Sequence, residues 1–284
     1  MVKEGCVTEL LRIENLKQHF VSGKGIFRKG YTVKAVDGVS LAVRRGETLG
    51  LVGESGCGKS TLGRTILKLY EPTAGKIYYE GRDITALSSR EMRPLRKEMQ
   101  IVFQDPMESL NQRHTVGVIL EEPFIIHRIG TPQERKQWVR ELLVKVGLPK
   151  ESVNRYPHEF SGGQRQRIGI ARAIALKPKL LICDESVSAL DVSVQAQILN
   201  LLLHLQQQMN LAIIFISHDL SVVKRISDRV AVMYYGKIVE MGKIKEVYAN
   251  PQADYTKRLL AAVPVTHPRD RKRKRRTNNS SNVA

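Results

Sequence analysis

Short apolar runs, each ended by glycine or polar residues, mark three positions along the chain. They are TLGLVG at residues 48–53, LLICDES ending at Ser186, and LAIIFIS at residues 211–217. Continuous apolar runs of this length are typical of strands buried on both faces of a sheet. Between the second and third runs, VSVQAQILNLLLHLQQQM places apolar residues at helical spacing. Strands that alternate with helices predict an α/β fold with a mostly parallel sheet.

Two other regions have a different pattern. Near the start, LLRIENLKQHF, YTVKAVDGVSLAV and GKIYYEGRDI alternate apolar and polar residues, which predicts antiparallel strands. From about Asp105 to Tyr156 no such strand pattern occurs, and TVGVILEEPFIIH and QERKQWVRELLVKVGL predict helices. We therefore expect residues 1–104 and 161–264 to form one core with an antiparallel β subdomain, and residues 105–160 to form an inserted helical subdomain.

A glycine-rich loop, GESGCGKST, follows the first apolar run and opens a helix predicted from about Lys59 to Tyr70. It matches GxxxxGK[ST], in which glycines let backbone N–H groups approach phosphate oxygens and the lysine reaches the outer phosphates. Ser60 is placed to ligate magnesium. The predicted nucleotide contacts are the consecutive residues of this loop, namely Gly53, Glu54, Ser55, Gly56, Cys57, Gly58, Lys59, Ser60 and Thr61.

Two adjacent carboxylates, Asp184 and Glu185, end the second apolar run. The carboxyl edge of a parallel sheet is where nucleotides bind, so Asp184 is predicted to hold magnesium and Glu185 to face the attacking water. His218 closes the third run and is placed to contact a γ-phosphate, although a lone histidine is more often a loop residue without such a role. Together these residues predict a P-loop ATPase or GTPase.

Composition narrows the class of protein. The chain has 284 residues and a formal charge of +18, with three cysteines that form no CxxC pair and no cluster with histidine. Neither a disulfide framework nor a zinc site is indicated. No apolar run approaches the roughly 20 residues that cross a bilayer, so we expect a chain that does not span the membrane. The charge suits an anionic partner without choosing among nucleotide, nucleic acid and lipid.

A second glycine-rich segment, FSGGQRQR at residues 160–167, resembles the signature motif of ATP-binding cassette (ABC) proteins. The resemblance then extends over nearly the whole chain, from about Leu10 to Pro264. It implies that Gln104 in IVFQDP is the Q-loop glutamine, which serves catalysis and the metal, and that His218 is the switch histidine. It also implies that the signature caps the ATP of a second subunit, through residues that begin a helix or belong to the D-loop SALD: Ser161, Gly162, Gly163, Gln164 and Asp191.

Longer phrases are similar to the ATPase subunits of binding-protein-dependent peptide and nickel importers. They are AVDGVSL, QIVFQDPMESLN, YPHEFSGGQRQRI, ALDVSVQAQILNLL, FISHDLSVV and NPQADYTKRLLAAVP. This resemblance implies a peripheral protein on the cytoplasmic face of the inner membrane that binds ATP and Mg²⁺. It implies as partners a second ABC ATPase subunit, two transmembrane permease subunits and, indirectly, an extracytoplasmic substrate-binding protein. Peptide, glutathione, nickel and metal chelates stay open as cargo.

Three points depart from the family pattern or stay open. Ser186 stands where many relatives have proline, and a polybasic tail over residues 265–284 stands where many have a cysteine-bearing extension. We expect this tail to be disordered, with contact to anionic lipids as the alternative. Tyr31 is favoured as the aromatic residue that stacks on adenine, with Phe20 as alternative. The alternative function is a soluble ABC-type ATPase acting on nucleic acid or ribosomes, although no reading motif for specific nucleic acid occurs.

Overall fold

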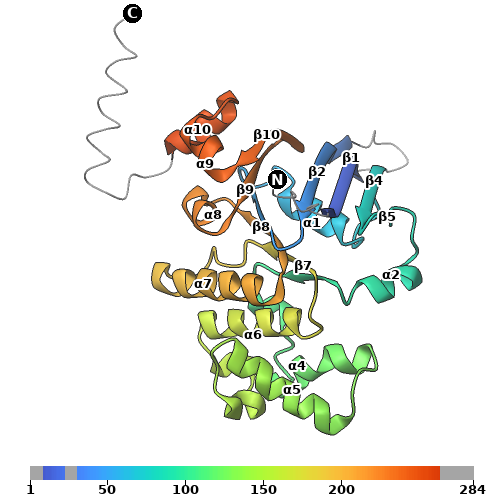
Figure 1. Ribbon diagram of the computed structural model, residues 1–284, viewed down its shortest axis with the longest axis vertical. Helices are drawn as coiled ribbons and strands as arrows, with labels where there is room; N and C mark the ends of the chain where they lie inside the picture. The colour runs from blue at the N-terminus through green and yellow to red at the C-terminus, as the bar shows by residue number, and fades with distance from the viewer. Residues whose placement is uncertain (1–8, 23–30, 263–284) are drawn as a thin grey trace, which may run out of the picture.

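The computed structural model describes residues 9–22 and 31–262, which form two sheets and the helices packed on them (Figure 1). Five adjacent strands of the six-stranded sheet run parallel to one another. The sixth strand lies at one edge and is antiparallel to its neighbour. The mostly parallel sheet predicted from the apolar runs is confirmed. Its strands, in spatial order, are β10 (Lys237–Lys243), β9 (Arg229–Tyr234), β3 (Thr48–Val52), β8 (Ala212–Ser217), β7 (Leu180–Asp184) and β6 (Met99–Val102).

The side chains of these strands divide between two apolar clusters. In β7, for example, Leu180 and Ile182 belong to one cluster, whereas Leu181 and Cys183 belong to the other. Alternate residues of a strand point to opposite faces, so a continuous apolar run is needed when both faces are covered. This double burial is why β3, β7 and β8 are readable from the sequence as uninterrupted apolar runs.

The second sheet has four antiparallel strands, as the alternating apolar and polar pattern predicts. Its order is β2 (Tyr31–Arg44), β1 (Glu9–Ser22), β4 (Ala74–Tyr79) and β5 (Arg82–Asp83). The buried side chains of this sheet share one cluster with Leu62 and Ile66 of α1 (Lys59–Ile66). Helix α1 thus lies between the two sheets. It ends at Ile66, before the predicted Tyr70, because Lys68 adopts a positive φ of 55°.

The opposite face of the large sheet is covered by three helices whose buried side chains share the second cluster. They are α6 (Gly162–Ile174), α7 (Val192–Met209) and α8 (Leu220–Ile226). Helix α8 lies close to β3, since a Cβ placed on Gly50 would come within 2.3 Å of Val223 Cγ1. Helices α9 (Ile244–Ala249) and α10 (Asp254–Ala262) follow β10 and end the described part of the chain.

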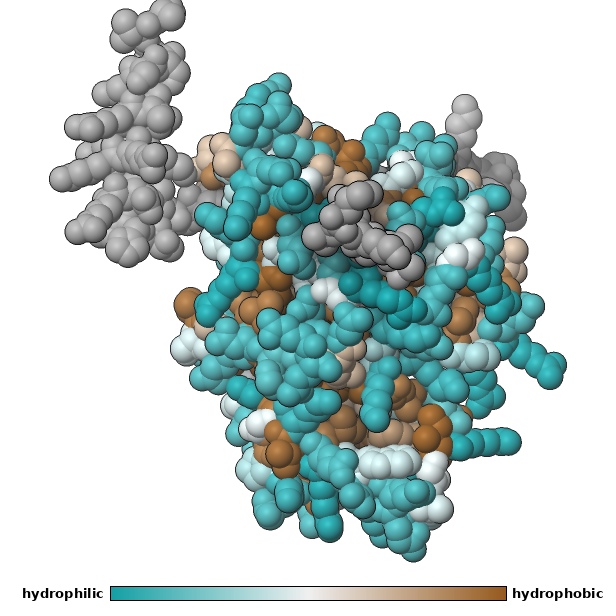
Figure 2. Space-filling model, viewed as in Figure 1, coloured by the Kyte–Doolittle hydropathy of each residue, from teal (hydrophilic) through white to brown (hydrophobic). Residues whose placement is uncertain are grey.

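The predicted helices of the middle region are α4 (Val116–Ile126) and α5 (Pro132–Lys145), which lie at the end of the molecule farthest from the small sheet (Figure 1). Phe124 and Trp138 join them with ring centroids 5.1 Å apart. Space-filling Figure 2 shows apolar side chains gathered on this lower half of the molecule. Four short elements without a clear sequence pattern lie within this region or before it in the chain. They are α2 (Ser89–Leu95), α3 (Pro106–Ser109), η1 (Lys150–Asn154) and η2 (Pro157–Glu159).

Two further sequence predictions concern the polybasic tail and membrane-crossing helices. The polybasic tail, residues 265–284, lies outside the described residues, and its predicted disorder and lipid contact stay predictions. Across residues 9–22 and 31–262, no helix is long and apolar enough to cross a membrane.

We expect Gly50→Ala to lower the free energy of unfolding by about 1–3 kcal/mol, because the added methyl group overlaps Val223 and Ser227. Gly169→Ala is the matched control, since a Cβ at this buried helical position would meet no atom within 4 Å apart from its chain neighbours and its own helix backbone. Alanine is also the better helix former there, by up to about 1 kcal/mol. Urea unfolding measures both variants. Equal stability of Gly50→Ala and the parent chain would contradict the close packing of α8 on β3.

Candidate functional site

The glycine-rich loop joins β3 to the amino end of α1 and depends on close backbone approach. Gly58 has a φ of 108°, and a Cβ there would lie 1.9 Å from the carbonyl oxygen of Ala35. At Gly53 a Cβ would lie 2.2 Å from the carbonyl oxygen of Met233. Only glycine fits these two positions. The loop therefore presents its backbone N–H groups together with the amino end of α1, an arrangement that attracts phosphate.

A cavity of about 720 Å³ lies against this loop. Most of the predicted loop contacts, from Ser55 to Thr61, line it, together with Gln104 and Glu185. Gly53 and Glu54 do not line the cavity and instead shape the first turn of the loop. The remaining walls come from the small sheet and the β9–β10 turn: Phe20, Thr32, Val33, Lys34, Ala35, Asp37, Tyr235 and Gly236.

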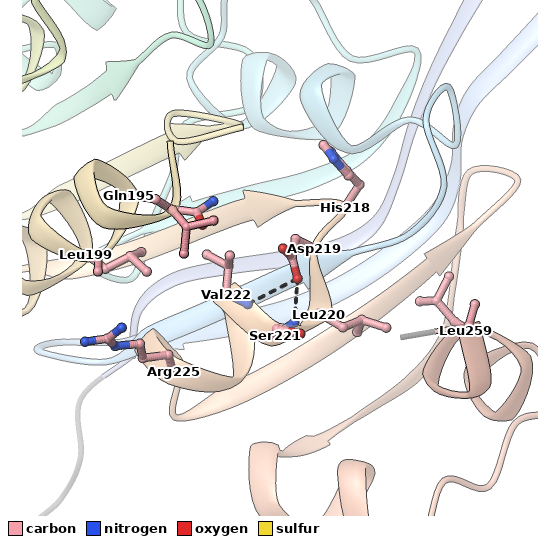
Figure 3. A pocket seen from close by; sticks show the side chains of 12 residues that line it. Gln195, Leu199, His218, Asp219, Leu220, Ser221, Val222, Arg225 and Leu259 are labelled. Atoms are coloured by element: carbon pink, nitrogen blue, oxygen red, sulfur yellow. Dashed lines mark hydrogen bonds between the residues drawn. The ribbon is translucent and has the colours of Figure 1, made fainter. Parts of the chain in front are cut away.

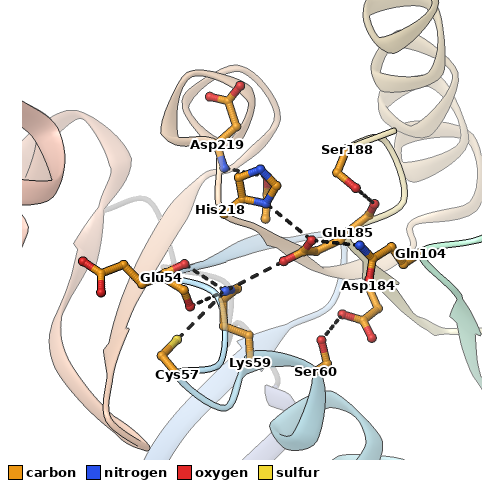
Figure 4. Close-up of polar contacts among 12 residues, drawn as sticks. Glu54, Cys57, Lys59, Ser60, Gln104, Asp184, Glu185, Ser188, His218 and Asp219 are labelled. Atoms are coloured by element: carbon orange, nitrogen blue, oxygen red, sulfur yellow. Dashed lines mark hydrogen bonds and ion pairs between the residues drawn. The ribbon is translucent and has the colours of Figure 1, made fainter. Parts of the chain in front are cut away.

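Lys59 is almost fully buried, with 4% of its surface exposed. Its ammonium Nζ donates to the carbonyl oxygens of Gly53 and Glu54, at 2.8 and 2.9 Å, and lies 3.9 Å from Glu185 Oε1 (Figure 4). A buried cation needs such partners, since an unpaired one would carry a large desolvation cost. The same group is within the cavity wall, where it can exchange these partners for phosphate oxygens.

Asp184 ends β7 beside α1. Ser60 Oγ donates to its Oδ1 at 2.6 Å, and Arg64 Nη2 lies 3.7 Å from its Oδ2. Burial raises the pKa of Asp184, while the hydrogen bond from Ser60 and the charge of Arg64 oppose that rise. A hydroxyl and a carboxylate in contact are hard oxygen donors, and Mg²⁺ is bound by few protein ligands beside water and phosphate. These residues therefore fit that ion. No group of three or more His, Cys, Asp or Glu in the described ranges could hold another metal.

Glu185 is the residue on which the site converges. Its Oε2 lies 3.3 Å from Gln104 Nε2 and 3.4 Å from His218 Nδ1, and Lys59 faces its other oxygen (Figure 4). The residue has a positive φ of 47°, which is uncommon for any residue other than glycine, and Ser188 Oγ donates to its carbonyl oxygen at 2.9 Å. Strained backbone of this kind persists where surrounding contacts hold it, and it clusters at functional sites. Four of the predicted residues are thus brought into direct contact.

The signature residues are separated from this cavity. Ser161 is the N-cap of α6, with its Oγ accepting from the N–H of Gln164, whose side chain accepts the N–H of Ser161 in return. Gly163 packs on α7, where a Cβ would lie 2.3 Å from Val194 Cγ1. Asp191 is the exposed N-cap of α7. None of the signature residues, and not Asp191, lines the cavity.

The aromatic residues of the cavity differ from the preferred sequence prediction. Tyr31, favoured for stacking on adenine, is 64% exposed and does not line the cavity, whereas the alternative, Phe20, does. Phe20 also packs edge-on against Tyr70, with ring centroids 5.5 Å apart. Tyr235 lines the cavity and was not predicted. Its signal is the sequence YYGK between two strand runs, where Tyr235 and Gly236 both take positive φ as a tight hairpin turn requires.

A second cavity, of about 580 Å³, lies between α7, α8 and α10 (Figure 3). His218 and Asp219 stand at one side of it, and Leu199, Leu220 and Leu259 contribute apolar walls. Asp219 is occupied as the N-cap of α8, accepting from the N–H of Ser221 at 2.7 Å. The cavity lacks the converging polar groups of the phosphate loop.

The family model described as ABC transporter matches residues 36–188, which include the phosphate loop, Gln104, the signature and both carboxylates. The chain belongs to the ABC transporter family. It therefore is an ATP-binding protein, and the family predicted from the signature motif is confirmed.

Curated proteins similar to this ABC protein include two transport components. The oligopeptide transport ATP-binding protein AppF of Bacillus subtilis is 56% identical over 92% of the chain and 80% of its own length. The oligopeptide transport ATP-binding protein OppF of Salmonella typhimurium is 54% identical over 91% of the chain and 79% of its own length.

Solved structures agree with the fold. A dimeric post-hydrolysis state of the ATP-binding cassette MJ0796, bound to ADP and Pi, has a TM-score of 0.73 and 27% identity, covering 82% of this chain and 98% of that one. The cbiO1 structure from Clostridium perfringens, part of the ABC transporter complex cbiONQ, also has a TM-score of 0.73, with 29% identity over 86% of this chain and 92% of its own. The predicted P-loop ATPase fold is confirmed.

Lys59→Ala should raise the dissociation constant for ATP at least tenfold, because a charged hydrogen-bonding group is lost from a buried phosphate site. Isothermal calorimetry with ATP measures the affinity, and circular dichroism checks the fold. Lys68→Ala removes another buried lysine, one that contacts Glu71 and the carbonyl oxygen of Thr85 away from the cavity, and serves as control. Undiminished ATP affinity of Lys59→Ala would contradict the assignment.

Proposed function

We propose that this protein is the ATP-binding and hydrolysing subunit of a binding-protein-dependent peptide importer. The proteins AppF and OppF, which it resembles over most of its length, are named as oligopeptide transport ATP-binding proteins. Further relatives at 52% identity are named as putative peptide import ATP-binding proteins. These names support the importer predicted from the sequence and favour peptide over the other predicted cargoes. They do not support the alternative of a soluble ATPase acting on nucleic acid or ribosomes.

The convergence of Lys59, Gln104 and His218 on Glu185 is the observation that carries hydrolysis. A water molecule beside the Glu185 carboxylate can pass its proton to that group while its oxygen attacks the γ-phosphorus, and ADP leaves. Gln104 and His218 contact Oε2 and so restrict the carboxylate to one orientation. Lys59 stabilises negative charge on the outer phosphates. An intact base and an intact phosphate loop argue against a purely regulatory module.

We propose Mg²⁺ as the metal cofactor, which Ser60, Asp184 and Gln104 would hold. The contact of 2.6 Å between Ser60 and Asp184 supports this pairing of oxygen donors. When bound, the ion neutralises charge on the β- and γ-phosphates. Asp184 is buried and its pKa is raised by that burial, so a cation beside it would favour the ionised form that ligates metal.

The signature residues support a second ATP-binding chain as partner. Ser161, Gly162 and Gly163 begin a helix of 13 residues whose amino end is an anion site, yet they lie outside the chain's own cavity. We propose that Ser161 to Gln164 and Asp191 close over the nucleotide of an identical or related subunit. One chain thus carries two phosphate-binding segments because each nucleotide is held between two chains.

The membrane partners are proposed to dock on the exposed end of α4. Ile125 and Ile126 are 51% and 50% exposed there, and Arg93 Nη2 of α2 donates to the carbonyl oxygen of Ile126 at 3.1 Å. Burial, with the positive charges of Lys97 and Arg93, lowers the pKa of His127 at this end. An apolar surface beside basic side chains suits a cytoplasmic helix with apolar and acidic residues.

The proposed sites lie in two different parts of the chain. We propose that residues 1–104 and 161–264 form the ATPase core and residues 105–160 the helical subdomain that contacts two permease subunits. The protein would then lie peripherally at the cytoplasmic face of the inner membrane. A substrate-binding protein would be an indirect partner that delivers peptide from the other side.

Glu185→Gln is expected to bind ATP with unchanged affinity yet to lower the rate of hydrolysis at least a hundredfold, because the amide cannot accept the proton from water. Phosphate release measures turnover, and gel filtration with ATP should show a persistent dimer. Glu246→Gln, an exposed carboxylate on α9 that does not line the cavity, is the control and should keep the parent rate. Normal turnover by Glu185→Gln would exclude this residue as the base.

Replacing Ile125 and Ile126 by aspartate should weaken assembly with the permease subunits at least tenfold and keep the ATPase rate of the isolated chain. Acidic groups on this surface would repel an acidic partner helix and remove apolar contact. Val144→Asp on α5, where the side chain is 52% exposed, is the control. Copurification with the permease subunits measures assembly, and equal yields for both variants would place the docking surface elsewhere.

A further inference from the structure

The segment NPQADYTKRLL, which begins α10, has no role in the site described so far. The structure fixes the start of this helix to the edge of the large sheet. The carboxylate of Glu240 on β10 accepts the N–H of Gln252 at 2.8 Å and the N–H of Ala253 at 3.0 Å. A carboxylate at the amino end of a helix satisfies free N–H groups and interacts favourably with the helix dipole. Helix α10 is therefore held in a defined place beside β10.

Tyr255, in the first turn of α10, reaches from this place to the phosphate loop. Its hydroxyl oxygen accepts the backbone N–H of Glu54 at 3.1 Å, across a separation of 201 residues in the sequence. The residue is 7% exposed, and its ring stacks on Tyr234 with centroids 4.1 Å apart. Burial raises the pKa of Tyr255, so the hydroxyl stays neutral at physiological pH.

The first turn of the phosphate loop is also held by Lys59, through contacts that a nucleotide can replace. Lys59 Nζ donates to the carbonyl oxygens of Gly53 and Glu54. Phosphate oxygens of a nucleotide compete for the same ammonium group, so these bonds are exchanged when a nucleotide binds. Tyr255 does not line the cavity, so a nucleotide held there would not compete for its hydroxyl. Its bond to Glu54 can hold the turn while Lys59 changes partners.

The β9–β10 turn contacts the phosphate loop, and the end of β9 contacts Tyr255. Gly236 donates its N–H to the carbonyl oxygen of Cys57 at 2.9 Å, and Tyr234, on which Tyr255 stacks, precedes this turn. Tyr234 also contacts Tyr235, with ring centroids 4.4 Å apart, and Tyr235 lines the cavity. The helix, the turn and the phosphate loop thus form one contiguous set of contacts.

We propose that Tyr255 is a positioning residue of the nucleotide site, which holds the first turn of the phosphate loop through the N–H of Glu54. The inference rests on the proposed function, since it assigns α10 a part in binding ATP. In this role, Tyr255 makes α10 a support for the phosphate loop. The role needs a hydroxyl at this position in addition to an aromatic ring.

Tyr255→Phe tests this role, because it keeps the ring and removes only the hydroxyl. We expect the dissociation constant for ATP to rise about fivefold, within the range for loss of one hydrogen bond that leaves a backbone N–H unpaired. Tyr248→Phe is the matched control: its hydroxyl also contacts backbone, donating to the carbonyl oxygen of Leu220 at 2.5 Å, away from the loop. Calorimetry with ATP and thermal unfolding are measured for the parent chain and both variants.

Amide hydrogen exchange of the nucleotide-free chain supplies a readout that a general loss of stability would not move. Exchange across residues 53–57 should be faster in Tyr255→Phe than in the parent chain and unchanged in Tyr248→Phe. The proposal is overturned if Tyr255→Phe leaves this exchange and the ATP affinity unchanged, or if both variants change them equally. Failure of the parent chain to bind ATP would instead overturn the proposed function.

Discussion

The buried ammonium group of Lys59 is the charge around which the site is organised. A cation with 4% of its surface exposed is tolerated only where oxygen atoms surround it, and the loop supplies two carbonyl oxygens while Glu185 supplies a carboxylate. Those contacts also orient Glu185, the proposed base, and the loop toward one another. If the same ammonium group binds phosphate, as proposed, nucleotide binding would rearrange the contacts that now hold Lys59.

The parallel sheet explains why these groups meet. Strands β3, β7 and β8 are adjacent, and their carboxyl ends deliver the phosphate loop, the two carboxylates and His218 to one edge. Gln104 follows β6, the edge strand that pairs with β7, and so reaches the same place. The site is therefore assembled from four strand ends. Rigid strands hold the groups, whereas the loops between them carry the chemistry.

The separation of the signature from the cavity has a mechanical consequence. Ser161 caps a helix that packs on α7 and on the α4–α5 region, so movement of that region carries the signature with it. Gln104, which contacts Glu185, lies two residues before the start of α3. Hydrolysis and docking can thereby be coupled within one chain.

Local patterns in the sequence determined the phosphate loop, the Asp184–Glu185 pair and the buried strands, because each depends on neighbouring residues and on strand or helix periodicity. The register of β1 and β2 was not determined, since bulges along this pair shift it, and a shift decides which aromatic side chain reaches the cavity. Tyr31 pairs with Ser22 at the open end, whereas Phe20 lies opposite Val33 and lines the cavity. The contact between Tyr255 and Glu54 was equally out of reach, because it joins segments distant along the chain. Only the packing of α10 against the sheet brings the hydroxyl within hydrogen-bonding distance of the loop.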